Sequence, residues 1–158
     1  PMTNRRHLDA IEELAQEALR EHGLAQKGWT FQWNRAVRRS GICRFGKRRI
    51  GLSKPLAALN SFAESKDTIL HEIAHALAGF DAGHGPRWVA LAKSIGCNGE
   101  RCAGRAVVLP PSKFIGTCPV CSGRLRRNRR TRCACASCCR RLNDGRWAPQ
   151  FELRWTRG

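Results

Sequence analysis

Residues 67–88 read DTILHEIAHALAGFDAGHGPRW and set three histidines and a glutamate in a strongly apolar background. His71 and His75 are four residues apart, so on a helix of about 3.6 residues per turn their imidazoles point to the same side, with Glu72 beside them. The remaining helix positions are apolar nearly all round, which is typical of a helix in a protein core. Two imidazoles on one side of such a helix indicate a shared metal ion.

The spacing His71-Glu72-x-x-His75 matches the HExxH pattern. In that pattern two imidazoles hold Zn²⁺, and the glutamate takes a proton from the attacking water and returns it to the leaving amine. A catalytic zinc also needs a third protein ligand and one open position. His84, which follows a glycine-containing turn, is the ligand that we predict, and Glu100 is the alternative. The competing interpretation is a chance match of this short pattern in a core helix.

The chain is strongly basic. It holds 29 Lys and Arg against 12 Asp and Glu, a net charge of +17, and residues 101–158 alone hold 14 basic and 2 acidic side chains. Such a chain is expected to have an anionic partner, most often nucleic acid. No apolar run approaches the ~18 residues of a membrane span, and the charged N-terminal stretch does not resemble a secretory signal. We therefore expect a soluble intracellular monomer, cytoplasmic or nucleoid-associated, with no membrane partner.

Nine cysteines without a secretory signal favour metal-bound thiolates over disulfides. Two Cys-x-x-Cys pairs separated by 13 residues are typical of a structural zinc ribbon, with the ligands Cys118, Cys121, Cys135 and Cys138. Cys133 and Cys139 lie close enough in sequence to replace either ligand of the second pair. The pattern assigns no role to Cys43, Cys97 or Cys102.

Between the two cysteine pairs, residues 124–132 read RLRRNRRTR and contain no acidic residue. A loop held by zinc would present these side chains to phosphates, which predicts DNA binding through Arg124, Arg126, Arg127, Arg129, Arg130 and Arg132. The competing interpretation is a solvated basic loop without a partner. Three aromatic residues downstream could stack on bases of single-stranded DNA or pack the ribbon against the rest of the protein: Trp147, Phe151 and Trp155.

The N-terminal half is predicted to mix helices and strands, an α+β fold. Residues 8–19 have the apolar spacing of an amphipathic helix, which Gly23 would end. Alternating or glycine-bounded segments at residues 29–34, 41–46 and 48–53 predict a small antiparallel sheet of about three strands.

Further helices are predicted around the histidines. Pro55 would open a helix that turns Leu56, Leu59 and Phe62 inward. The histidine helix is expected to start at residues 66–68, capped by Asp67, and to end near Gly79. A last helix is expected over residues 87–95, followed by a strand-like run at residues 107–109 and a boundary at Pro110 and Pro111.

The stretch HEIAHALAGFDAGHGPRWVALAKSIG resembles the core of the SprT-like (Spartan) zinc metalloprotease family, whose pattern is HExxH, a spacer and His-Gly-x-x-Trp. TFQWNRAVRRSGICRFGKRRIGLSKPL resembles that family's segment before the active-site helix, and a Cys-x-x-Cys ribbon follows as in many members. The resemblance covers about residues 29–142. It implies a zincin-like metalloprotease domain over residues 2–109 and a small zinc-ribbon, Arg-rich DNA-binding subdomain over residues 112–158.

The resemblance also implies roles for residues. His71, His75 and His84 would hold a catalytic zinc, Glu72 would be the catalytic acid and base, and the ribbon would hold a structural zinc. The implied activity is an endopeptidase stimulated by DNA, single-stranded or duplex, that acts on DNA-bound or DNA-crosslinked proteins, as in crosslink repair. Since the chain has no tyrosine, zinc itself or Arg87 would stabilise the oxyanion.

Two alternatives remain open from the sequence. One is a DNA-binding zinc-ribbon protein whose HExxH site is structural or vestigial. The other is hydrolysis of a small amide or another non-protein substrate by the same zinc.

Overall fold

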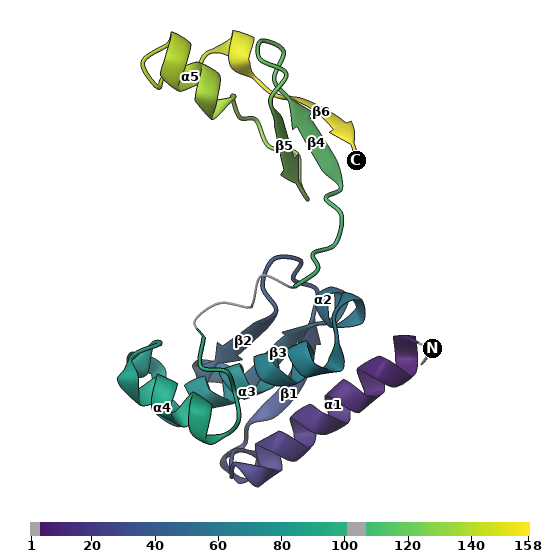
Figure 1. The fold of residues 1–158 in the computed structure, drawn as a ribbon, viewed down its shortest axis with the longest axis vertical. Helices are drawn as coiled ribbons and strands as arrows, with labels where there is room; N and C mark the ends of the chain where they lie inside the picture. Colours follow the sequence, from purple (N-terminus) through teal and green to yellow (C-terminus); the bar gives the residue numbers. More distant parts are fainter. Residues whose placement is uncertain (1–3, 101–106) are drawn as a thin grey trace. The chain divides into compact units, whose positions relative to one another are not determined.

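The computed structural model describes residues 4–100 and 107–158, and the chain forms two compact units, Pro1–Pro110 and Pro111–Gly158. The first unit contains helices α1 to α4 and a three-stranded sheet, and the second contains a separate three-stranded sheet with helix α5 (Figure 1). The α+β prediction is confirmed. Within the described residues, no helix is long and apolar enough to cross a membrane.

The sheet of the first unit contains β1 (Thr30–Asn34), β2 (Gly41–Arg44) and β3 (Arg49–Ser53) in the order β1-β3-β2. β2 pairs with β3 antiparallel, but β1 pairs with β3 parallel, so the prediction of a wholly antiparallel sheet is wrong. The reason lies in burial: β3 has more buried residues than β1 or β2, and in the central position both of its edges are paired with a neighbouring strand. Alternation along a strand indicates its buried face but not its neighbour.

The first unit has four helices: α1 (Asn4–Glu21), α2 (Lys54–Leu59), α3 (Phe62–Ala78) and α4 (Pro86–Ser94). The first three contact the sheet, and α4 packs on α3. The predicted apolar face of α1 is the buried one, and it packs on α3 and β1. Together they form the main core, whose buried members are Ile11, Ala15, Ala18, Leu19, Leu24, Trp29, Ile50, Leu52, Ala57, Ile69 and Ile73. A second cluster between α3 and α4 holds Leu70, Ala74, Ala78, Trp88, Ala92 and Cys97.

Helix α3 begins four to six residues before the predicted start. Ser61 is its N-cap: the Ser61 hydroxyl accepts from the Glu64 N–H at 3.2 Å, and the Glu64 carboxylate accepts from the Ser61 N–H at 3.3 Å. This reciprocal pair is a capping box, which the sequence Ser-x-x-Glu encodes. Asp67, the predicted cap, lies inside the helix, where its carboxylate accepts from the Asn98 N–H at 2.8 Å.

Two smaller predictions are also wrong. Leu56 is buried as expected, but Leu59 and Phe62 are 47% and 40% exposed, because α2 ends at Leu59 and Phe62 begins a new helix. Residues 107–109 form no strand. Instead, the Asn60 side-chain amide bonds both backbone groups of Val108, accepting from its N–H at 2.7 Å and donating to its carbonyl at 2.9 Å.

The second unit contains β4 (Phe114–Thr117), β5 (Arg124–Arg127), α5 (Ala136–Leu142) and β6 (Arg154–Arg157). β4 is central and antiparallel to both neighbours. The buried cluster of this unit is small, and half of it is cysteine: Cys118, Cys138, Cys139, Ala148, Phe151 and Leu153. A unit of this size rarely supplies enough apolar burial to be stable by itself, so it needs a staple such as a metal.

Replacing Ser61 tests the capping box. Ser61→Ala leaves the Glu64 N–H without its acceptor, so we expect the free energy of unfolding of the first unit to fall by about 1 kcal/mol. Ser61→Thr keeps a hydroxyl at the N-cap and should cost less. Urea unfolding followed by far-ultraviolet circular dichroism measures both changes, and equal stability of the two variants would contradict this role of Ser61.

Candidate metal centres and active-site cleft

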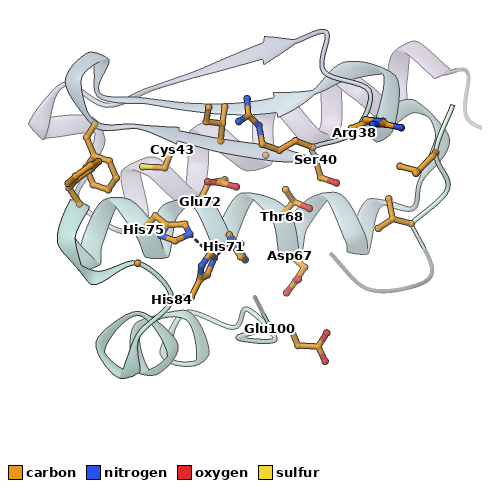
Figure 2. Close-up of a pocket in the computed structure, with 18 residues that line it drawn as sticks. Arg38, Ser40, Cys43, Asp67, Thr68, His71, Glu72, His75, His84 and Glu100 are labelled. Carbon is orange, nitrogen blue, oxygen red and sulfur yellow. Dashed lines mark hydrogen bonds between the residues drawn. The ribbon is translucent and has the colours of Figure 1, made fainter. Parts of the chain in front are cut away.

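Three imidazoles from two segments of the chain meet beside α3. His71 and His75 project from α3, and His84 lies between the short helix Phe80–Ala82 and α4 (Figure 2). The Nε2 atom of His84 is 3.1 Å from Nε2 of His71 and 3.1 Å from Nε2 of His75. Gly79 and Gly83, with φ of 92° and 50°, adopt backbone conformations that let the chain reverse and return His84 to the helix.

These separations fit ligation of one ion. A tetrahedral zinc with Zn–N bonds of about 2.0–2.1 Å holds two nitrogens about 3.3 Å apart, close to the separations found. Burial, with a smaller effect of the neighbouring imidazoles, lowers the pKa of His75 to about 4, and burial also lowers the pKa of His71. Both imidazoles are therefore neutral at pH 7, the form that binds metal. The group is compatible with zinc.

Trp88 of α4 packs against all three imidazoles and is fully buried. Its ring centroid is 4.6 Å from His71, 4.6 Å from His84, and 5.2 Å from His75, on which it stacks with an interplanar angle of 29°. Among buried side-chain nitrogens and oxygens of the described residues, Trp88 Nε1 is the one without a hydrogen-bond partner. The indole thus fixes the imidazole rings by packing, and the unpaired N–H shows that packing outweighs hydrogen bonding at this position.

Glu72 lies beside the imidazoles and is only 7% exposed. Burial raises the pKa of its carboxyl to about 7, against the opposing effects of the Arg39 charge and a backbone hydrogen bond from Cys43. A Cβ on Gly41 would lie 2.6 Å from Glu72 Oε1 and 2.8 Å from its Cγ, so only glycine at this point of β2 leaves room for the carboxylate. A cation on the imidazoles would favour the ionised carboxylate.

The imidazoles and Glu72 open into a cleft of about 740 Å³, which lies wholly in the first unit. Its size is typical of ligand-binding sites. Eighteen of the described residues line it: Arg38, Arg39, Ser40, Gly41, Ile42, Cys43, Phe45, Asp67, Thr68, His71, Glu72, His75, Phe80, Gly83, His84, Glu100, Val107 and Leu109. They come from the β1–β2 loop, β2 and the turn after it, α3 and the turn that carries His84, and the described residues that follow α4.

The cleft also places the residues that sequence reasoning left open. Glu100 lines it but lies outside the metal group of three imidazoles. Arg87, on α4, is exposed and absent from the described lining, whereas Arg38 and Arg39 belong to it. Burial, helped by the Glu72 charge, raises the pKa of the Cys43 thiol to about 12, so this thiol is protonated and unreactive at neutral pH.

In the second unit, Cys118, Cys121, Cys135 and Cys138 form a group of four thiols. Sγ of Cys118 is 3.8 Å from Sγ of Cys138, and Sγ of Cys121 is 3.6 Å from Sγ of Cys135. A tetrahedral zinc with Zn–S bonds of about 2.3 Å separates its sulfurs by about 3.8 Å, so the group is compatible with a zinc ribbon.

The remaining cysteines of the described chain lie outside both groups. Cys133 accepts a hydrogen bond from the Thr131 hydroxyl, and Cys139 is buried in the small apolar cluster. Burial raises the pKa of Cys97, a member of the α3–α4 cluster, to about 11. Cys102 lies outside the described residues. These environments are those of structural thiols.

The six arginines of the basic run do not share one surface. Thr117 of the central strand pairs with Arg124 on one side and Arg154 on the other, so these two side chains lie on the same face of the second sheet. Side chains alternate between faces along a strand, so Arg126, two residues after Arg124, lies on that face too. Arg127 lies on the opposite face, and Arg129 follows the end of β5 and is exposed.

Two further arginines of the run are engaged within the ribbon. The Arg130 guanidinium stands 4.9 Å from the Phe114 ring centroid. Arg132 lies 4.9 Å from the Trp147 ring centroid and forms an ion pair with Glu152 at 3.4 Å.

The three candidate aromatics also differ from one another. Phe151 is buried, and Trp155 covers Gly116 and donates to the Thr131 carbonyl at 3.0 Å, so both pack within the ribbon. Trp147 is 46% exposed, the most of the three, with the Arg132 guanidinium over its ring.

Replacing Trp88 tests its packing against the imidazoles. Trp88→Ala should weaken metal binding at the three histidines about tenfold or more, because the rings lose the contact that orients them. Trp88→Phe keeps an aromatic face but removes the unpaired N–H with part of the ring system, and it should retain most of the affinity. Competition with a chromophoric chelator measures this, with Trp147→Ala as the control. Unchanged affinity in a folded Trp88→Ala variant would contradict the role.

Comparison with known protein families supports a common origin for the first unit. The model of the SprT-like family matches residues 8–107, a span that holds most of α1, all of α2 to α4, the first sheet, Glu72 and all three imidazoles. No curated protein and no solved structure matches the chain in the corresponding searches. Because the family match covers more than half of the sequence, the chain belongs to the SprT-like family.

Proposed function

We propose that the protein is a zinc-dependent endopeptidase, with a zincin-like catalytic domain over residues 2–109. The observation that carries the proposal is the meeting of three imidazoles, with Nε2 of His84 3.1 Å from Nε2 of both His71 and His75, beside a buried glutamate in an open cleft. When held by His71, His75 and His84, zinc supplies a Lewis acid and a water of lowered pKa.

Glu72 carries the proton transfers in this proposal. Its carboxylate accepts a proton from the attacking water and donates it to the leaving amine. A carboxyl pKa raised by burial brings the group nearer to neutral pH, where it can exchange protons in both directions. Gly41 and the Cys43 backbone hold the carboxylate against β2. Arg39 lines the cleft and its charge acts on Glu72, so it is better placed than Arg87 to stabilise the oxyanion.

The second unit supports a DNA-directed task. We propose that residues 112–158 form a zinc ribbon that binds DNA and brings the peptidase to DNA-bound or DNA-crosslinked proteins, in the cytoplasm and at the nucleoid. The sheet face with Arg124, Arg126 and Arg154 would contact phosphates, and Trp147 offers a ring for base stacking.

A DNA-binding protein with a structural histidine site is the second candidate, and the strongly basic second unit is what favours it. The position of Glu72 weighs against this candidate. A buried carboxyl without a chemical role would be a net cost to stability, and a structural site needs none beside its ligands.

The proposal is tested by Glu72→Gln. We expect the wild type to cleave a DNA-bound substrate protein in the presence of DNA, and the variant to lose at least about 100-fold in rate because it has no base. Zinc content should stay at two atoms per chain, since both ligand groups remain. Asp81→Asn, at an exposed carboxylate outside the cleft, is the matched control and should keep full activity. Equal activity of wild type and Glu72→Gln would rule out the assigned role.

The DNA-binding face is tested by replacing Arg124, Arg126 and Arg154 together with Gln. The log–log slope of affinity against salt should become shallower by about 2 to 3, because each lost phosphate contact removes about 0.7 to 0.9. Replacing Arg140 and Arg141, two exposed arginines of α5, is the control. Fluorescence anisotropy with single-stranded and duplex DNA gives both slopes. An equal loss from the control variant would mean that only net charge matters.

A further inference from the structure

An exposed aromatic ring stands at one end of the active-site cleft. Phe80 lies in the turn between His75 and His84, lines the cleft, and is 77% exposed, more than any other exposed large apolar residue of the described chain. Single exposed apolar residues are common on proteins. An exposed phenyl ring that lines the cleft beside the three imidazoles is a different case, because it offers apolar surface to a ligand that enters the cleft.

The Phe80 ring packs edge to face on another aromatic ring, which packs in turn on a third. Its centroid is 5.6 Å from that of Phe45, at 90°, and Phe45 is 5.8 Å from Trp29, at 84°. Edge-to-face geometry at these distances is the favourable one for aromatic pairs. Trp29 belongs to the main core, so the three rings connect the exposed ring to the packed interior. The surface at this end of the cleft is therefore preformed.

The two ends of the cleft differ in polarity. Toward the N-terminal end of α3, the lining carries Arg38, Asp67 and Thr68, which Figure 2 shows on the side of His71 away from His75, together with Val107. Past the C-terminal end of α3, the lining carries Phe80 and Phe45, whose rings are in contact. A polypeptide lying across the imidazoles would therefore meet charges on one side and aromatic surface on the other.

We propose that Phe45 and Phe80 form a subsite for a large apolar side chain close to the scissile bond. This inference rests on the proposed peptidase function and specifies its substrate class. Folded proteins bury most of their large apolar side chains, so such a subsite would select extended segments of unfolded or partly unfolded proteins. Native surfaces, which expose mainly short polar and charged side chains, would be cleaved slowly.

The test uses two unstructured peptides that differ only in Phe or Ala at one position beside the cleavage site, with DNA present. The wild type should cleave the Phe peptide with a kcat/KM about tenfold higher. Phe80→Ala should abolish this preference, so that the two peptides are cleaved with equal kcat/KM. Phe62→Ala removes an exposed phenyl ring outside the cleft and should retain the preference. Phe45→Leu keeps a large apolar side chain at this position of the subsite, so it should weaken the preference without unfolding the core.

Binding separates the subsite from the chemistry. The Glu72→Gln variant should bind the Phe peptide about tenfold more tightly than the Ala peptide, measured by fluorescence anisotropy without turnover. Equal cleavage and equal binding of the two peptides by proteins with intact Phe80 would overturn the subsite and leave the peptidase standing. Preferential binding without any cleavage by the zinc-loaded wild type would support the subsite and overturn the proposed function. Neither binding nor cleavage of either peptide would overturn both.

Discussion

Helix α3 has to be buried and polar at once, and the first unit is arranged around that constraint. One side, with Ile69 and Ile73, packs into the main core, and another, with Leu70, Ala74 and Ala78, packs on α4. The polar residues occupy what is left. Buried polar groups are costly without partners, so this polar stripe needs an open cleft and close packing support. The imidazole cluster, the indole beneath it and the glycine of β2 supply that support.

Much of this site could be predicted from local spacing. His71 and His75 share a helix face because four residues span about one turn, and a turn rich in glycine made the return of His84 plausible. The rest of the cleft could not be predicted, because strand pairing brings Gly41 to it, and Arg39 and Phe45 follow in the segments on either side of β2. The parallel pairing of β1 shows the same limit: alternation marks a buried face, whereas the choice of neighbour depends on which strand is most buried overall.

The second unit shows how far composition and spacing reach. Two Cys-x-x-Cys pairs were enough to identify the four thiols that meet, since the two-residue gap suits chelation. The run of six arginines predicts one basic loop. In the structure, strand alternation places Arg124 and Arg126 on the other face of the sheet from Arg127, and the guanidinium groups of Arg130 and Arg132 lie over aromatic rings. Charge in a sequence thus indicates a kind of partner, while the fold decides which charges face it.

The central claim is that three imidazoles hold one zinc ion with a coordination position left open for chemistry. X-ray diffraction from crystals of the full chain, recorded on both sides of the zinc absorption edge, tests it directly. The account predicts two anomalous peaks, one among the four ribbon thiols and one among Nε2 of His71, His75 and His84, with no fourth protein ligand at the latter. The absence of a peak among the imidazoles would contradict it. So would a zinc ion there whose fourth coordination position is filled by a protein side chain such as Glu100.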